Sequence, residues 1–302
     1  MERLLQTLII GVDTGAIYAL IALGMVLVYR TTGVLNIAHG GVGVLVGFIA
    51  WDLITLRGWP YYAGVTVGIL VAIALGVAFE FLVIRRLAGR PDLQTVSTLG
   101  LFLLTQSVVF LVPWWGNTWG QLFPSPLLGK NVRVPVANYA VSWDTIVLLL
   151  VGVTIFAALY YMLKRTRLGM AMRAVADDAG AARIMGVQPY RVSMFVWGLA
   201  FGLSGLTTML VAPIVFLDNT SLTSLTLKAL VVTFIGGLVS LPLTVFGAML
   251  LGLLEAYSQI YAPNAEGLSD AWPFILLLVV LTLRFARGGG KSTFSDGATV
   301  RA

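Results

Sequence analysis

The chain has no cysteine and only one histidine, His39, among its 302 residues. Disulfide bonds, thiolate metal sites and cysteine nucleophiles are therefore excluded, and a single imidazole cannot build a histidine-rich metal centre. The sequence also has no paired catalytic aspartates and no His-Glu-x-x-His motif. We accordingly expect no metal site, no catalytic group and no cofactor in this chain.

Charged residues are scarce as well. Only 11% of the residues are charged and 59% are apolar, whereas ordinary soluble domains have about 25% charged and 45–50% apolar residues. So few polar side chains cannot cover a globular surface in water. The composition excludes a soluble enzyme, a disordered chain and a disulfide scaffold, and it predicts that most of the chain faces lipid.

Long apolar stretches follow one another along the whole chain. A hydrocarbon core about 30 Å thick needs about 20 apolar residues of helix, and four of the stretches are short for this purpose. The sequence therefore predicts an all-α, polytopic transmembrane helical bundle with about eight to ten spans, some of them short or broken. The stretches are Leu4–Tyr29, Gly41–Leu56, Tyr61–Ile84, Leu93–Val112, Trp143–Leu163, Val192–Val215, Leu225–Leu238, Val245–Gln259 and Trp272–Phe285.

The formal net charge of +6 comes from short basic runs between the apolar stretches. This pattern is typical of membrane topology and not of nucleic-acid binding. Runs within 85–90, 164–191 and 284–291, with Arg301, hold 13 of the 19 positive residues. We expect these runs and the C-terminus in the cytoplasm. The loop Pro113–Ser142 is then outside, as is the N-terminus if all nine stretches span.

The C-terminal tail contains a sequence that resembles the end of a phosphate-binding loop. Gly288–Thr293 ends in Gly-Lys-Ser-Thr, but Phe285 stands where the first glycine of the motif belongs. A membrane span and not a strand precedes it. We interpret residues 288–302 as a flexible cytoplasmic tail and residues 1–287 as a single transmembrane domain.

We place four charged residues at membrane depth, where a charge is costly and is a functional candidate: Asp13, Glu80, Lys228 and Glu255. Glu80 is expected to pair with the basic turn at 85–86, and Lys228 to extend its ammonium group toward the interface. Asp13 and Glu255 lie deeper. For these two, a role in a pathway and a simple buried hydrogen bond are equally compatible with the sequence.

Two glycine-rich segments interrupt the apolar stretches, at Gly33–Gly41 and at Gly236–Pro242. Broken helices at membrane depth occur where protein or a cavity satisfies the backbone, and paired breaks indicate the pathway of a transporter. An ordinary hydrogen-bonded histidine near the interface is the alternative for His39. The residues that we expect to line a translocation path or gate are Asn36, His39, Gly236, Gly237, Ser240 and Glu255.

The most polar segment, about 165–191, is too long for a tight turn. Within it, Met170–Met185 has no proline and favours a helix that ends at Gly186. A short helix outside the membrane can receive force from a soluble partner, or it can be a solvated connection without one.

Three blocks of sequence, in the same order, resemble those of the LivH-type permeases, the membrane subunits of ABC importers for branched-chain amino acids. Gly15–Gly24 and Tyr29–Gly40 are similar to the N-terminal block of that family. Arg173-Ala174 with Ala181–Val187 is similar to its cytoplasmic coupling segment. The third block comprises Lys228-Ala229, Gly236-Gly237, Ser240–Pro242 and Gly252–Ala256.

The resemblance implies a permease domain over residues 1–287 in a bacterial cytoplasmic (inner) membrane. It implies four kinds of partner: a LivM-type sister permease, two cytoplasmic ABC ATPase subunits, a soluble extracytoplasmic substrate-binding protein, and the lipid membrane. ATP hydrolysis is then expected in the partners, so this chain is not an enzyme. The resemblance assigns contact with the ATPases to Arg173, Asp177, Ala181, Ala182 and Gly186.

Branched-chain or related hydrophobic amino acids are the solutes that the resemblance implies, delivered by the binding protein. Relatives also move ureas, amides and aromatic acids, which leaves another small organic solute open. A different class, an ion-coupled secondary transporter, would use Asp13, Glu80 or Glu255 as ion sites. An intramembrane enzyme has little support in the sequence, because the motifs that it needs are missing.

Overall fold

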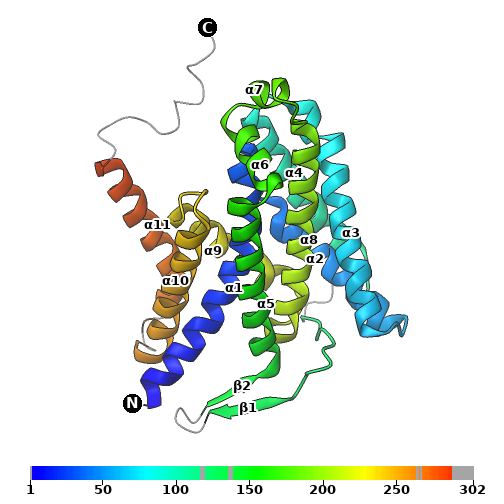
Figure 1. The fold of residues 1–302 in the computed structure, drawn as a ribbon. Helices are drawn as coiled ribbons and strands as arrows, with labels where there is room; N and C mark the ends of the chain where they lie inside the picture. The colour runs from blue at the N-terminus through cyan, green and yellow to red at the C-terminus, as the bar shows by residue number, and fades with distance from the viewer. Residues whose placement is uncertain (1, 116–119, 135–138, 263–264, 266, 288–302) are drawn as a thin grey trace.

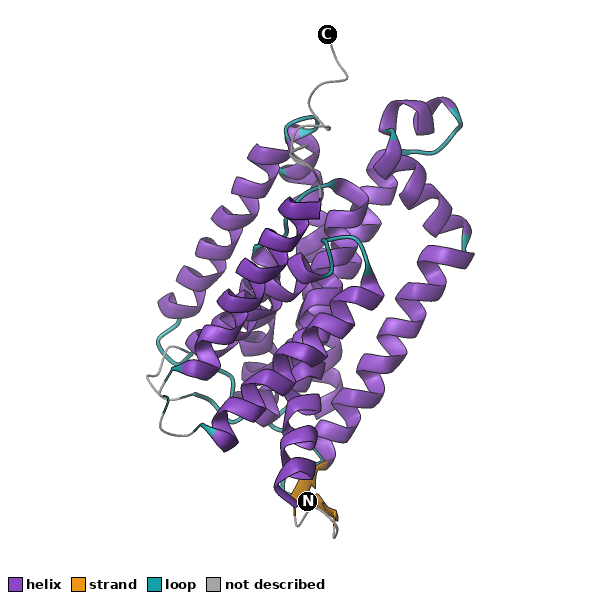
Figure 2. Cartoon of the chain, turned by 90° about the vertical axis from the view of Figure 1, so that its left-hand side faces the viewer, coloured by secondary structure: helices purple, strands orange, loops and turns teal. Residues whose placement is uncertain are grey.

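A computed structural model describes residues 2–115, 120–134, 139–262, 265 and 267–287. Most of these residues belong to helices that run side by side along the long axis of the molecule (Figures 1 and 2). Two short helical turns, η1 and η2, extend longer helices. The helical elements in chain order are α1 (Glu2–Thr32), α2 (Ala38–Trp51), η1 (Asp52–Leu56), α3 (Tyr61–Leu82), η2 (Ile84–Leu87), α4 (Pro91–Leu111), α5 (Trp143–Arg165), α6 (Arg167–Asp177), α7 (Ala179–Ile184), α8 (Pro189–Val215), α9 (Asn219–Ile235), α10 (Leu241–Tyr261) and α11 (Leu268–Arg287).

A helix covers each of the nine predicted stretches, which confirms the polytopic helical fold. Among the described residues, seven helices are long and apolar enough to cross a membrane: α1, α2 with η1, α3 with η2, α4, α5, α8 and α10. The other two, α9 and α11, are shorter apolar helices. The expected short α2 span reaches 19 residues because the π-helical turn η1 continues it.

The loop between α4 and α5 contains a feature that the sequence analysis missed. Strands β1 (Asn131–Val134) and β2 (Tyr139–Ser142) form an antiparallel hairpin. Ser142 ends the hairpin and also caps α5, because its hydroxyl accepts a hydrogen bond from the Asp144 amide at 3.1 Å. The hairpin lies at the same end of the bundle as the N-terminus (Figure 1).

Helix α1 is the centre of the bundle and packs against α10, α8, α9 and α5. Its closest neighbour is α10, where Gly252 faces Gly11 and Gly15. A side chain at Gly252 would come within 2.7 Å of the Gly15 Cα atom, so only glycine permits this approach. In lipid, close backbone packing of this kind drives helix association.

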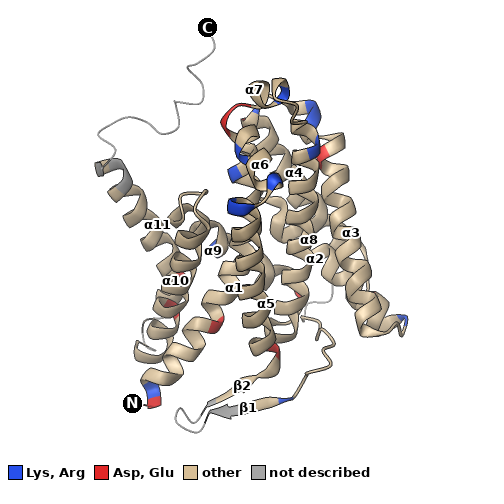
Figure 3. Cartoon of the chain, viewed as in Figure 1, with Lys and Arg blue, Asp and Glu red and all other residues tan. Residues whose placement is uncertain are grey.

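Basic side chains gather at the end of the bundle that carries α6 and α7 (Figure 3). The hairpin and the N-terminus are at the opposite end (Figure 1), and buried Asp144 stands there too, in the first turn of α5 directly after β2. This segregation is the pattern that the basic runs predict. The expected flexible tail at 288–302, the Gly288–Thr293 motif and Arg301 lie outside the described residues.

The first break, between α1 and α2, is stabilised by threonines of α4. The Thr95 hydroxyl accepts from the Leu35 amide at 3.3 Å, and the Thr98 hydroxyl accepts from the Ile37 amide at 3.2 Å. Thr98 also donates to the Leu35 carbonyl at 2.9 Å. The backbone is thus satisfied by protein, as a break at membrane depth requires.

The polar segment at 165–191 forms two helices and not the single helix expected over Met170–Met185. Helix α6 ends at Asp177, and Asp178 has an extended backbone that caps α7. Its carboxylate accepts from the Gly180 and Ala181 amides at 2.7 and 3.0 Å. An aspartate competes with the helix for backbone amides and so favours a cap over a helix interior; the expectation of one helix was wrong for this reason.

Candidate functional site

A narrow cavity lies between α1, α2, α8 and α9. Ser204, Ile21 and Thr226 stand near the middle of α8, α1 and α9, so the cavity lies about halfway along the bundle. In this conformation it has room for roughly one water molecule. Its lining residues are Ile21, His39, Gly40, Ser204, Thr207, Thr208, Val211, Leu222 and Thr226.

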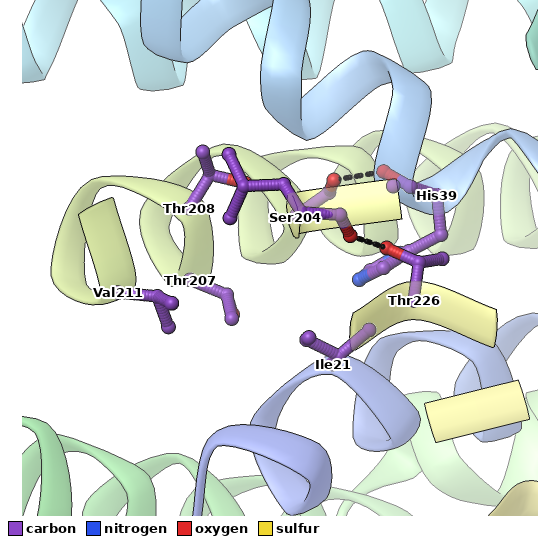
Figure 4. Close-up of a pocket in the computed structure, with 9 residues that line it drawn as sticks. Ile21, His39, Ser204, Thr207, Thr208, Val211 and Thr226 are labelled. Atoms are coloured by element: carbon purple, nitrogen blue, oxygen red, sulfur yellow. Dashed lines mark hydrogen bonds between the residues drawn. The ribbon is translucent and has the colours of Figure 1, made fainter. Parts of the chain in front are cut away.

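The cavity is unusually polar for the interior of an apolar bundle. The imidazole of His39 points into the space bordered by Thr207, Ile21 and Thr226 (Figure 4). The hydroxyls of Ser204 and Thr226 donate to the backbone carbonyls of His39 and Leu222, the second at 2.8 Å. The first bond joins α8 to the start of α2, whereas the second lies within α9.

Several polar atoms here are buried without a hydrogen-bond partner. They include both ring nitrogens of His39 and the hydroxyl of Thr207, and both residues are at most 2% exposed. An unpaired buried polar group costs about 1–3 kcal/mol. The cavity therefore contains donor and acceptor groups that the fold itself leaves unpaired, and a polar ligand could form hydrogen bonds with them.

His39 is fully enclosed and does not lie near an interface, which was the alternative interpretation. Its ring packs where a side chain at Gly24 of α1 would stand. Asn36, just before α2, is also completely buried, and neither its amide nitrogen nor its amide oxygen has a partner. The first break thus brings two unpaired polar side chains into the interior.

The second predicted break lies elsewhere. Gly236 and Gly237 end α9, and Ser240 caps α10. Among described residues, none of the three lines the His39 cavity. They lie beside the end of α1, where the Arg30 guanidinium donates to the Val239 carbonyl at 3.4 Å.

Glu255 of α10 belongs to a separate ionic cluster. The Tyr18 hydroxyl donates to one carboxylate oxygen of Glu255 at 2.6 Å, and the Lys228 ammonium lies 3.2 Å from the other. Lys228 also contacts Asp270 at 2.9 Å. Contrary to expectation, Lys228 forms ion pairs between helices and does not extend alone toward the interface. These two contacts link Glu255 of α10 to α1 and α9, as expected for a residue that stabilises helix packing.

In the described part of the chain, neither Glu80 nor Asp13 forms an ion pair. Contrary to expectation, Glu80 thus forms no direct ion pair with the turn at 85–86 within the described chain. Its carboxylate is buried beside Ser193 of α8, and the positive charge of Arg85 still attracts it. Arg85 instead stands 4.8 Å from the ring centre of Tyr190. Asp13 accepts a long hydrogen bond, at 3.5 Å, from Thr145.

The coupling residues expected from the sequence lie at the tip of the basic end. Ala181 and Gly186 are exposed, but Ala182 faces inward and is only 4% exposed. Asp177 is exposed at the end of α6, and Arg173 is partly buried and donates to the Leu163 carbonyl. Gly186 has φ of +87°, so it is the residue that ends α7 in the left-handed conformation.

Sequence reasoning missed the two most exposed apolar residues of this tip. Ile184 is 88% exposed and Met185 is 83% exposed, immediately before Gly186. The two side chains form an exposed apolar pair at the tip of the basic end. The hydroxyls of Ser204, Thr207, Thr208 and Thr226 were missed too, because isolated serines and threonines in apolar helices are common and carry no pattern.

Known proteins match nearly the whole chain. Residues 7–281 match the family described as branched-chain amino acid transport system / permease component. The high-affinity branched-chain amino acid transport permease proteins BraD of Pseudomonas aeruginosa and LivH of Escherichia coli K12 are each 28% identical. Their alignments cover 93% and 92% of this chain, and 94% and 92% of the relative.

A more distant relative carries a different name. The autoinducer 2 import system permease protein LsrC of Klebsiella pneumoniae is 30% identical over 78% of this chain and 64% of its own length. No solved structure matches the chain at a significant level.

Proposed function

Because this chain belongs to the family of permease components of branched-chain amino acid transport systems, we propose that it carries such amino acids, or close hydrophobic relatives, through the cavity at His39. As a member of that family it is a transport subunit of an ATP-driven importer, which works with ATPase and substrate-binding partners. An ion-coupled transporter and an enzyme are not favoured.

The observation that carries the proposal is the unused hydrogen-bonding capacity at half depth. An amino acid must leave water to cross the bundle, and its ammonium and carboxylate groups need polar partners there. His39 and Thr207 provide such groups beside apolar Ile21 and Val211. This combination suits a solute with a polar end and an apolar side chain.

The cavity must widen to admit an amino acid. We therefore assign the present conformation to a closed state of the path, between openings to the two sides. Helices α8 and α9 line it, and α8 begins directly after the segment that carries α7. Movement of α7 by an ATPase would thus reach the cavity walls through α8.

Ile184 and Met185 are the residues that we expect to insert into a groove of the ATPase, with Ala181 and Gly186 beside them. Apolar side chains that become fully enclosed supply most of the binding energy at such interfaces. Arg173 and Asp177 would then position the helix and not contribute the main contacts. Gly186 is needed for the turn itself.

The basic end is assigned to the cytoplasm, by the excess of lysine and arginine there. The hairpin, β1 and β2, then faces the binding protein, and the chain ends in the cytoplasm. We further propose a LivM-type sister permease that completes the path, two ATPase subunits, and residence in a bacterial inner membrane.

Uptake by the complete importer in proteoliposomes tests the cavity. Thr207→Val removes the unpaired hydroxyl at constant shape, and we expect leucine uptake to fall about tenfold with unchanged assembly. Thr154→Val, on the exposed face of α5, is the matched control. Equal uptake by the two variants would contradict the assignment. Urea and benzoate, assayed alongside leucine, test the solute class.

A further inference from the structure

A second open space lies at the basic end of the bundle. It is bounded by the end of α1, the end of α5 and the turn between α9 and α10, and it measures about 580 Å³ including its mouth. It is separate from the His39 cavity. Its lining residues are Arg30, Tyr160, Leu163, Lys164 and Val239–Pro242.

This space is strongly cationic. Arg30 and Lys164 line it, and the Lys164 ammonium stands 4.6 Å from the ring centre of Tyr160. Arg173 of α6 is close enough to Arg30 to repel it. In the described part of the chain, none of these three cations forms an ion pair with a carboxylate. Uncompensated charge of this kind favours an anion.

A purely apolar groove runs between the same three helices, further from the basic end. It measures about 400 Å³, and no polar atom lines its surface. Gly152 of α5 lies in its wall, and a Cβ atom there would be at ordinary contact distance, 3.5 Å, from Leu20 of α1. Its walls include Leu20, Leu23, Gly152, Phe156, Val245 and Met249.

The groove and the cationic space are lined by neighbouring residues on two helices. On α5, Phe156 of the groove stacks on Tyr160 of the cationic space, with ring centres 5.9 Å apart. On α10, Val245 of the groove is one helical turn from Pro242 of the cationic space. A ligand here would have an anionic head and a long apolar body.

We propose that this composite site binds an anionic phospholipid of the cytoplasmic leaflet. Its phosphate lies between Arg30 and Lys164, with Arg173 nearby, and one acyl chain follows the groove between α1, α5 and α10. Basic pockets between membrane helices on the cytoplasmic side recognise such head groups. The inference rests on the proposed orientation of the bundle. A lipid bound there would stabilise the packing of α1, α5 and α10 next to α6.

Native mass spectrometry of the assembled importer tests the site, with phosphatidylglycerol and phosphatidylcholine as competing probes. We expect one tightly retained phosphatidylglycerol. In the Arg30→Gln/Lys164→Gln variant its affinity falls roughly 30-fold, from two lost charges. Arg165→Gln/Arg167→Gln removes two neighbouring exposed charges that do not line the space and should leave affinity within about twofold.

A second variant blocks the acyl groove without changing charge. Gly152→Leu fills the groove and should release the lipid, whereas Gly100→Leu, on an open face of α4, should not. Equal retention of both lipids, or full retention by both variant sets, would overturn the proposal. So would displacement by inorganic phosphate alone, or lipid binding by the isolated chain that is lost on assembly with the sister subunit. None of these readouts depends on transport.

Discussion

The ion pair between α9 and α10 allows a quantitative prediction. In the Lys228→Met variant, Glu255 loses a cation at 3.2 Å while its side chain stays 4% exposed. Removal of one partner from a buried pair costs about 3–5 kcal/mol. The Tyr18 hydroxyl still donates to Glu255, so we expect a loss of unfolding free energy near the lower limit, about 3 kcal/mol.

The second change, Glu255→Gln, should restore much of that stability. A neutral amide keeps the hydrogen bond from Tyr18, and Asp270, whose side chain is 75% exposed, remains hydrated without Lys228. We expect the double variant to recover about 2 kcal/mol relative to Lys228→Met. Reversible unfolding in mixed detergent–lipid micelles measures these differences, with Lys130→Met on the exposed hairpin side as the matched control.

The same variants decide whether Glu255 stabilises helix packing or is part of the path. If it stabilises helix packing, the double variant folds and keeps ATP-dependent uptake. A path residue would instead give a stable double variant without uptake. Additive losses of stability from the two single changes, with no recovery in the double variant, would refute the ion-pair reasoning itself.

Three further predictions concern the coupling tip, the cavity and the central helix crossing. The double variant Ile184→Asp/Met185→Asp should reduce ATP-dependent uptake at least tenfold without loss of membrane insertion. The control Leu128→Asp, at the opposite end, should leave uptake unchanged. Equal effects of the two variants on uptake would contradict the docking surface. His39→Leu should raise the unfolding free energy by about 1 kcal/mol, because it removes an unpaired imidazole. The same change should lower uptake, and unchanged uptake would show that His39 has only a structural role. Gly252→Leu should destabilise the α1–α10 crossing by about 3 kcal/mol, measured as loss of folded protein after extraction, and an unaltered yield would contradict the packing.

Most of the fold was predictable because membrane spans depend on local composition. Each apolar stretch corresponds to a helix. The hairpin at 131–142 was not predictable, because a two-stranded ribbon of eight residues has no distinct hydrophobic period. The break at Asp178 was missed because good helix formers flank it on both sides.

The candidate site was only partly predictable. His39 and Asn36 were found because polar residues between glycines are conspicuous in an apolar chain. Ser204 and Thr226, which line the cavity with His39, are distant from it in sequence, and only the packing of α8 and α9 against α2 brings the three together. Lys228 was misjudged for the same reason, since its position in α9 does not reveal that Glu255 faces it.

The central claim is that this chain moves its solute only as a subunit of an ATP-driven importer. The most direct measurement compares leucine uptake into proteoliposomes by this chain alone and by the complete set of partners, each with ATP or with an imposed ion gradient. We predict uptake only with the partners and ATP, and none by the chain alone under any gradient. Uptake by the chain alone that collapses with the ion gradient would contradict the account.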